Sequence, residues 1–260
     1  LPEYSIHTTF VDPEDPENFR KAIKNNTKAI FIETLGNPNS EVVDIEEIAK
    51  IAHANKIPLV VDNTFATPIH CRPFEFGADI VTHSTTKYMD GHGAGVGGCI
   101  VDSGKFDWTR YPDRFPGLCQ PDESYHGVTY TERFGLEGAF ITKATAQLMR
   151  DFGSIQSPQN AFILNLGLES LHVRMKRHAE NCLAVARYLK NHDKIAWVKY
   201  CGLEGDDDYE LAQKYLPEGS CGVVSFGVKG GREAAEKFMG KLKVAAIETH
   251  VADARTCCLH

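Results

Sequence analysis

The sequence lacks the patterns that are typical of membrane, secreted and metal-binding proteins. No apolar run is long enough to span a bilayer, and no signal-peptide pattern opens the chain. The eight cysteines show no CxxC spacing and the eleven histidines no HxxxH spacing, which argues against a disulfide framework and against a metal site. We therefore expect reduced thiols, a cytoplasmic location and no bound metal.

Basic residues are also in the minority. The chain has 28 Lys and Arg against 35 Asp and Glu, so its formal net charge is −7, and neither a basic stripe nor an internal repeat stands out. This balance argues against nucleic acid as a partner. Hydrophobic residues make up 42% and charged residues 24% of the 260 residues, as in a globular protein with one large or two ordinary domains.

The first 105 residues alternate between strand and helix patterns. Asp15 followed by Pro16 predicts a helix start, with the helix running to about residue 25, and Asp44 with Glu47 forms a capping-box pattern for a second helix. Short apolar runs predict strands at residues 6–11, 28–33, 58–62, 79–82 and 96–101. Near-continuous apolar strands that alternate with an amphipathic helix predict an α/β fold with a parallel sheet covered on both faces.

The remaining residues predict a second, smaller unit. Residues 106–135 combine aromatic side chains with prolines, which predicts a long irregular segment, and a helix is expected at 138–151. Ser157 and Pro158 match the N-cap and first residue of a very long helix that ends near Leu189. Strands are then expected at 196–200 and 222–228, and a helix at 231–242. We expect a large domain over 1–160 and a smaller α+β domain over 161–260, entered by the long helix.

Polar side chains follow three neighbouring strands of the predicted sheet. Asn37 comes shortly after the 28–33 strand, Asp62 ends the 58–62 strand, and Lys87 follows the 79–82 strand. Because ligands of open parallel sheets bind at the carboxyl ends of the strands, we expect these three side chains to face one crevice.

These residue types suit the cofactor pyridoxal 5'-phosphate (PLP). The cofactor needs an amine for its aldehyde, which Lys87 can supply, and an anion beside its pyridine nitrogen, which Asp62 can supply. Its phosphate needs hydrogen-bond donors, and Ser84 and Thr86 carry hydroxyls. Taken singly, each residue favours a structural interpretation, since an Asp at a strand end is usually a cap and a Ser/Thr cluster is usually a polar loop. Their order on adjacent strand ends favours the cofactor.

The glycine-rich run over residues 91–98 invites a different hypothesis, a dinucleotide site. It precedes a strand instead of joining a strand to a helix, which argues against that hypothesis. Its expected role is to let backbone pass close to the site.

The chain resembles the Cys/Met-metabolism family of PLP-dependent enzymes. The resemblance rests on segments that lie in the family's order and span most of the chain: ETLGNP at 33–38, VDNTF at 61–65, DIVTHSTTKYMDGH at 79–92 and SPQNAFILNLGLESLHVRMKRH at 157–178. The aromatic insertion at 108–134, the segment at 165–178 and THVADARTCCLH at 249–260 are similar to the O-acetylhomoserine sulfhydrylase branch.

The resemblance implies a fold and a role for each residue. The fold is that of the aspartate aminotransferase-like PLP-dependent transferases, fold type I, with a mostly parallel sheet flanked by helices. Lys87 matches the lysine that bonds to the cofactor, Asp62 the partner of the pyridine nitrogen, and Ser84 and Thr86 the phosphate ligands. Asn37 matches an asparagine beside the cofactor and the substrate carboxylate.

The implied reaction is a γ-replacement that converts O-acetyl-L-homoserine and sulfide to L-homocysteine and acetate. A γ-lyase or a cystathionine γ-synthase of the same family is an alternative that keeps the cofactor. A catalytically silent subunit of the same fold is an alternative of another class.

The resemblance also implies how the chain relates to its family. The family's glycine-rich phosphate loop and its ring-stacking tyrosine match nothing in this chain, and neither does the substrate-carboxylate arginine. We therefore expect a fragment that lacks both termini. Family members build their sites across dimers that commonly pair into tetramers, so we expect a homodimer or homotetramer that acts on small molecules and not on membranes or nucleic acid.

Overall fold

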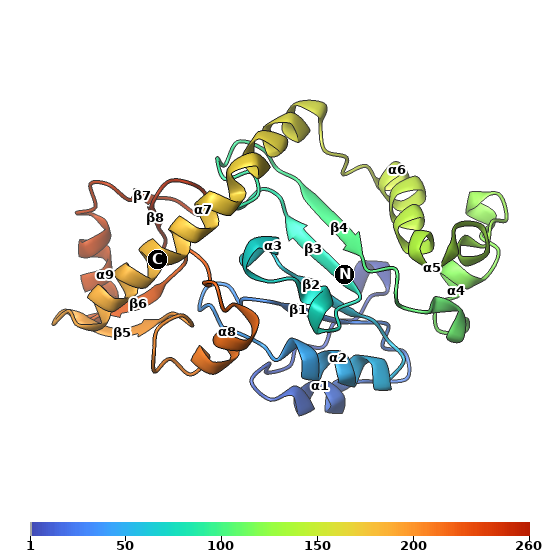
Figure 1. The fold of residues 1–260 in the computed structure, drawn as a ribbon, viewed down its shortest axis with the longest axis horizontal. Coiled ribbons are helices and arrows are strands. Elements are labelled where there is room, and N and C mark those ends of the chain that lie inside the picture. The colour runs from blue at the N-terminus through green and yellow to red at the C-terminus, as the bar shows by residue number, and fades with distance from the viewer. Residues whose placement is uncertain (1) are drawn as a thin grey trace.

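The computed structural model describes residues 2–260 and contains a central sheet of four strands in the order β1-β2-β3-β4 (Figure 1). The strands are β1 (Ile30–Glu33), β2 (Leu59–Asp62), β3 (Ile80–Ser84) and β4 (Gly98–Asp102). The first three run parallel, and β4 is antiparallel to β3. The predicted α/β architecture is therefore confirmed, with one strand reversed.

Two helices precede the second strand, and both begin as the sequence predicts. In α1 (Pro16–Ala22) the Asp15 carboxylate accepts a hydrogen bond from the Glu17 amide, and Pro16 is the first helical residue. In α2 (Ile45–Ala54) the Asp44 carboxylate accepts from the Glu47 amide at 3.2 Å. These caps satisfy amide groups that the first turn of a helix leaves without a partner.

One face of the sheet is buried along the three parallel strands. Helix α2 contributes Ile45, Ile48 and Ala52 to a core that contains the inward-facing strand residues Ile32 and Val61. On the opposite face Phe31 is 59% exposed and Ile100 is 49% exposed. Coverage of both faces was predicted, but within residues 2–260 the second face is covered only in part.

The cover on that second face comes from residues 103–152. Short helices, η3 (Trp108–Arg110), α4 (Pro116–Cys119) and η4 (Glu123–Tyr125), lead into α5 (Tyr130–Thr142), a π-helical segment (Lys143–Met149) and α6 (Arg150–Phe152). Phe106, Trp108 and Tyr130 form a second hydrophobic cluster that includes Ile80 of β3. This cluster packs against the amino end of β3 and leaves its carboxyl end free for a site.

Helix α7 (Pro158–Lys190) runs diagonally across the molecule and joins the central sheet to the C-terminal elements (Figure 1). Its cap is the Ser157 hydroxyl, which accepts from the Asn160 amide. One stripe of the helix is buried, and it consists of Gly167, Leu171, Met175, Ala179, Cys182 and Ala186. The spacing of three and four residues keeps this stripe on one side of the helix.

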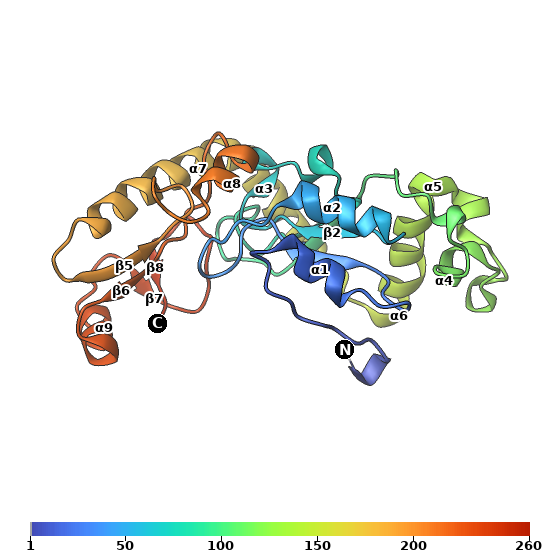
Figure 2. The same ribbon diagram turned by 90° about the horizontal axis from the view of Figure 1, so that it is seen from below.

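The C-terminal elements form two small sheets at one end of the molecule (Figure 2). Strands β5 (Ile195–Lys199) and β6 (Ser225–Val228) pair antiparallel, and β7 (Ala246–Ile247) pairs parallel with β8 (Cys257–Cys258). The helices are α8 (Tyr209–Tyr215) and α9 (Gly231–Met239), while η1 (Pro2–Tyr4), α3 (Thr67–His70) and η2 (Pro73–Phe76) lie earlier in the chain.

The structure departs from the expectations for three elements. Residues 6–11 form no strand, because no other described strand lies beside them, and Phe10 is 92% exposed. Strand β4 is antiparallel because the 13 residues between β3 and β4 contain no crossover helix, which a parallel return usually requires. The helix expected at 138–151 is present, but α5 itself starts at Tyr130, inside the segment predicted to be irregular, and is interrupted at Gly135, where φ is 71°. Residues 143–149 of the expected helix are π-helical.

Candidate functional site

The carboxyl ends of the three parallel strands bring acidic and hydroxyl side chains into one row. Glu33 pairs with Asp62 across β1 and β2, and Asp62 pairs with Thr82 across β2 and β3. Since side chains alternate between faces along a strand, Ser84 lies on the same face as Thr82. The sheet register therefore places Glu33, Asp62, Thr82 and Ser84 on one face, at the strand ends.

Asp62 is held by its neighbours on this face. One carboxylate oxygen accepts from the Thr64 amide at 2.9 Å, and the other lies 3.4 Å from the Thr82 hydroxyl. The Thr64 hydroxyl in turn accepts from the Ser84 amide at 2.8 Å. These bonds fix the end of β2 against the end of β3 and leave Asp62 with free acceptor capacity for a protonated ring nitrogen.

Lys87 lies in the turn that follows β3. Its amide donates to the Ser84 carbonyl at 3.2 Å, and its carbonyl accepts from the Gly91 amide at 2.8 Å. The backbone of Lys87 is thus bonded on both sides. Among residues 2–260 its ammonium forms no ion pair, and the residue is half-buried. A side chain of this kind is available for bonding to a ligand.

The two hydroxyls that were predicted to bind phosphate differ in their contacts. The Thr86 hydroxyl donates to the Gly97 carbonyl at 3.2 Å and accepts from the Gly97 amide at 3.1 Å. Its one proton is therefore used within the protein. The Ser84 hydroxyl has no hydrogen-bond partner in the described part of the chain, so its proton is free for an anionic ligand.

Asn37 is exposed in the loop after β1, and its bond to Pro38 is cis. The loop is fastened to the C-terminal part of the chain, because the Ser225 hydroxyl donates to the Pro38 carbonyl at 2.8 Å. Asn37 thus lies in a loop between the carboxyl end of β1 and β6.

Two further residues near Asp62 had no role in the sequence analysis. Partial desolvation and the nearby charge of Asp62 raise the pKa of Glu33, and burial lowers the pKa of His83. Glu33 places a second carboxyl group beside Asp62, on the face that would meet a cationic ring. The sequence feature that could have identified Glu33 is its position as the last residue of the 28–33 strand. Asp62 occupies the same position in the 58–62 strand.

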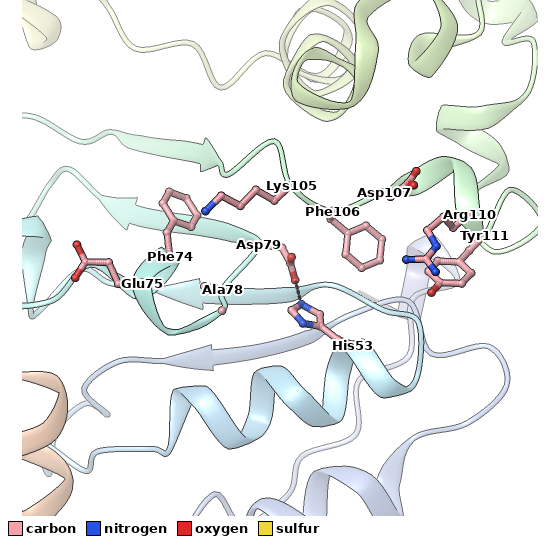
Figure 3. A pocket seen from close by; sticks show the side chains of 11 residues that line it. His53, Phe74, Glu75, Ala78, Asp79, Lys105, Phe106, Asp107, Arg110 and Tyr111 are labelled. Atoms are coloured by element: carbon pink, nitrogen blue, oxygen red, sulfur yellow. Dashed lines mark hydrogen bonds and ion pairs between the residues drawn. The ribbon is translucent and has the colours of Figure 1, made fainter.

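A cavity of about 540 Å³ lies elsewhere, at the amino end of β3, between α2 and the loop before η3 (Figure 3). In it the His53 ring lies 2.8 Å from the Asp79 carboxylate, which also accepts from the Leu59 amide. The bond to Asp79 raises the pKa of His53. None of the predicted site residues lines this cavity, so it is separate from the row at the strand ends.

Within residues 2–260, no group of three or more His, Cys, Asp or Glu side chains is arranged to hold an ion. All eight cysteines are free thiols, and burial raises the pKa of Cys71 to about 12. A thiol of that kind is inert at neutral pH.

Comparison with known proteins identifies relatives along the whole chain. A family model described as Cys/Met metabolism PLP-dependent enzyme matches residues 1–260. A homocysteine synthase of Schizosaccharomyces pombe is 46% identical over 257 residues, which cover 98% of this chain and 60% of the relative. An O-acetyl-L-homoserine sulfhydrylase of Leptospira meyeri is 43% identical, over 100% of this chain and 60% of the relative.

A solved structure from Campylobacter jejuni, described as an O-acetylhomoserine (thiol)-lyase, superposes with a TM-score of 0.90 at 33% identity. The match covers 96% of this chain and 61% of that one, which carries a pyridoxyl-lysine monophosphate residue. The chain thus spans about 60% of the length of the curated relatives that it matches.

Proposed function

The chain belongs to the Cys/Met metabolism PLP-dependent enzyme family, and on that premise we propose that it serves a γ-replacement reaction. In this reaction sulfide displaces acetate from O-acetyl-L-homoserine, and the products are L-homocysteine and acetate. The proposal rests on the position of Asp62 and of the turn that carries Lys87, which lie at the same end of the sheet. Thr64 connects them, because its amide donates to Asp62 and its hydroxyl accepts from the Ser84 amide.

The described residues fit PLP in three respects. Asp62 has acceptor capacity left for the protonated pyridine nitrogen, and Glu33 lies beside it on the same face of the sheet. The ammonium of Lys87 is unpaired within residues 2–260, and the Ser84 hydroxyl has a free proton for the phosphate. Thr86 would have to release its bond to Gly97 before it could donate as well.

PLP, when bound, withdraws electrons from the substrate carbon that carries the amino group. The protein's part is to place a base and to hold the ring. Lys87 Nζ would take the proton from the substrate Cα and return a proton at the end of the reaction, while Asn37 would face the substrate carboxylate. The backbone amide and carbonyl of Lys87 are both hydrogen-bonded, so its Cα is held in place while its side chain can rotate.

The first test is the substitution Lys87→Ala, with Lys105→Ala as its control. Lys105 is exposed and lines the separate cavity. We expect Lys87→Ala to abolish the visible absorption band of the PLP-loaded protein and the formation of homocysteine from O-acetylhomoserine and sulfide. Lys105→Ala should retain both. A visible band that persists in Lys87→Ala would remove Lys87 from the site.

The same assay separates replacement from elimination. The proposal predicts homocysteine in the presence of sulfide and little 2-oxoacid in its absence. Release of 2-oxoacid without sulfide, at a rate that matches or exceeds homocysteine formation, would contradict γ-replacement and would indicate a lyase.

The proposal extends to assembly and location. We propose a homodimer or homotetramer, and the large exposed side chains of Phe152, Ile155 and Phe162, close together in sequence, are candidates for its contacts. Eight free cysteines support a reducing compartment such as the cytoplasm. The separate sheets before and after α7 support domains at 1–160 and 161–260. Sedimentation velocity would test the assembly.

In residues 2–260, every helix is too short or too polar to cross a membrane.

A further inference from the structure

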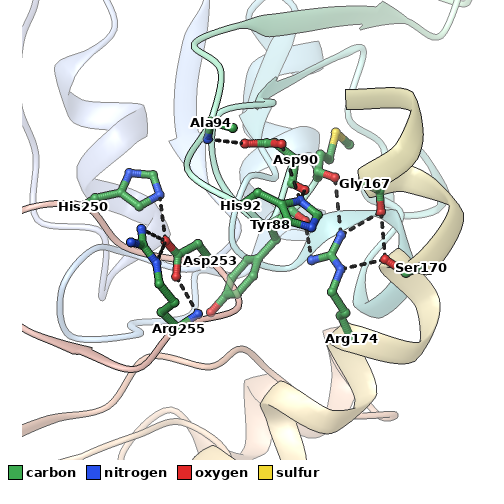
Figure 4. A network of polar contacts seen from close by, with 11 residues as sticks. Tyr88, Asp90, His92, Ala94, Gly167, Ser170, Arg174, His250, Asp253 and Arg255 are labelled. Carbon is green, nitrogen blue, oxygen red and sulfur yellow. Dashed lines mark hydrogen bonds and ion pairs between the residues drawn. The ribbon is translucent and has the colours of Figure 1, made fainter. Parts of the chain in front are cut away.

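The turn that carries Lys87 is enclosed by segments from distant parts of the chain (Figure 4). The Tyr88 ring is buried against Phe65 and His178, and its hydroxyl accepts from the Gly222 amide at 2.8 Å. The Ala254 amide donates to the Gly91 carbonyl at 2.8 Å. The position of the turn is therefore set by groups outside it.

Arg174 of α7 reaches this turn with two nitrogens of its guanidinium. Its Nη1 donates to the Tyr88 carbonyl at 2.8 Å, and its Nη2 lies 3.4 Å from the Met89 carbonyl. On the helix side, Nη2 also donates to the Gly167 carbonyl at 2.8 Å, and Nε to the Ser170 hydroxyl at 3.0 Å. The planar guanidinium thus bridges one turn of α7 and the two carbonyls that follow Lys87.

Two glycines make room for this arrangement. At Gly91 a Cβ atom would lie 2.3 Å from Nη1 of Arg174, so a larger residue would displace the guanidinium. At Gly167 a Cβ atom would lie 2.3 Å from the Asp90 carbonyl and 2.5 Å from the Met89 carbonyl. The helix and the turn are therefore in direct backbone contact at the place where Arg174 joins them.

We propose that Arg174 is a positioning residue, which holds the Lys87 turn against α7 and so fixes the point from which the Lys87 amine acts. The inference rests on the proposed role of Lys87. The contacts favour Arg over Lys, because only a guanidinium presents several N–H groups in one rigid plane. A lysine at this position would reach one carbonyl and leave the others without a partner.

The test compares Arg174→Gln and Arg174→Lys with Arg177→Gln. Arg177 lies on the same helix, its side chain is 72% exposed, and within residues 2–260 its one ion pair is with Glu180, at 3.3 Å. Hydrogen–deuterium exchange of the protein without PLP reports on the turn directly. We expect the amides of residues 87–91 to exchange about tenfold faster or more in both Arg174 variants, since a lost bond to a charged donor shifts an opening equilibrium by that much. Arg177→Gln should leave them unchanged.

Amides of α2 serve as an internal reference. If Arg174 acts locally, its substitution leaves the exchange rates of the α2 amides unchanged. If the amides of α2 and of residues 87–91 exchange faster by the same factor, Arg174 stabilises the whole protein and the proposal is overturned. Unchanged exchange at 87–91 would overturn it as well. If Arg174→Gln does not fold, Arg174→Lys carries the comparison.

With PLP added, the pH midpoint of the visible band should shift in the Arg174 variants, and kcat should fall more than KM rises. Arg177→Gln should change neither. If the unsubstituted protein shows no visible band with PLP, the proposed function fails, while the exchange data still decide whether Arg174 holds the turn.

Discussion

Replacement of Gly167 by alanine should measure how tightly α7 is pressed against the Lys87 turn. The new Cβ would lie 2.3 Å from the Asp90 carbonyl oxygen, which is 0.7 Å inside the 3.0 Å that real Cβ contacts respect. Both clashing groups are backbone carbonyls, so neither can rotate away. Overpacking of this kind costs about 3 kcal/mol at the upper end of its usual range.

Alanine also favours the helix, and this gain offsets about 1 kcal/mol of the loss. The net expectation is a decrease of about 2 kcal/mol in the free energy of unfolding. For a chain of this size that corresponds to a melting temperature lower by about 4–8 °C. Thermal unfolding followed by circular dichroism would measure it.

Gly117→Ala is the matched control, because a Cβ there would meet only Lys143, at 3.6 Å, which is an ordinary contact. We expect its melting temperature to stay within about 2 °C of the unsubstituted protein. A Gly167→Ala protein as stable as Gly117→Ala would refute the close packing of α7 on the turn.

Two further predictions concern single polar contacts. The bond to Asp79 raises the pKa of His53, so its stabilisation should be full below the unfolded pKa of about 6.5 and should fade as pH rises through the folded pKa. His53→Gln should then cost less stability at about pH 9 than at about pH 6, and an equal cost at both would count against the pair. Ser84→Ala should weaken PLP binding without loss of stability, whereas Thr86→Ala should also cost about 1 kcal/mol, because its hydroxyl is bonded to Gly97. Chemical unfolding and PLP titration of both variants would check this, and equal stabilities would contradict it.

The elements that the sequence predicts well are those with strong local signals. Asp15, Asp44 and Ser157 each cap the helix that was expected to follow them, because a short oxygen-bearing side chain at that position satisfies a free amide. The three parallel strands were predicted because each is a short apolar run. The family, the fold class and the family's dependence on PLP are confirmed by the matches.

The failures have a common physical cause, since each depends on contacts between distant residues. The run at 6–11 has the composition of a strand but no partner strand among the described residues. The direction of β4 depends on how the glycine-rich segment turns back. The extra helical residues from Tyr130, before the break at Gly135, pack in the aromatic cluster around Trp108. The hydrogen bond between Thr86 and Gly97 is a further contact with that returning segment that the local sequence does not predict.

The proposed roles of Asn37, Asp62, Ser84, Thr86 and Lys87 depend on a geometry that involves the cofactor. A crystal structure of the protein with PLP would test it most directly, through the two distances that define the site. The account predicts an Asp62 carboxylate oxygen at about 3 Å from the pyridine nitrogen and continuous electron density between Lys87 Nζ and the aldehyde carbon of the same ring. A ring bonded to a different lysine, or one whose nitrogen faces away from Asp62, would contradict the account.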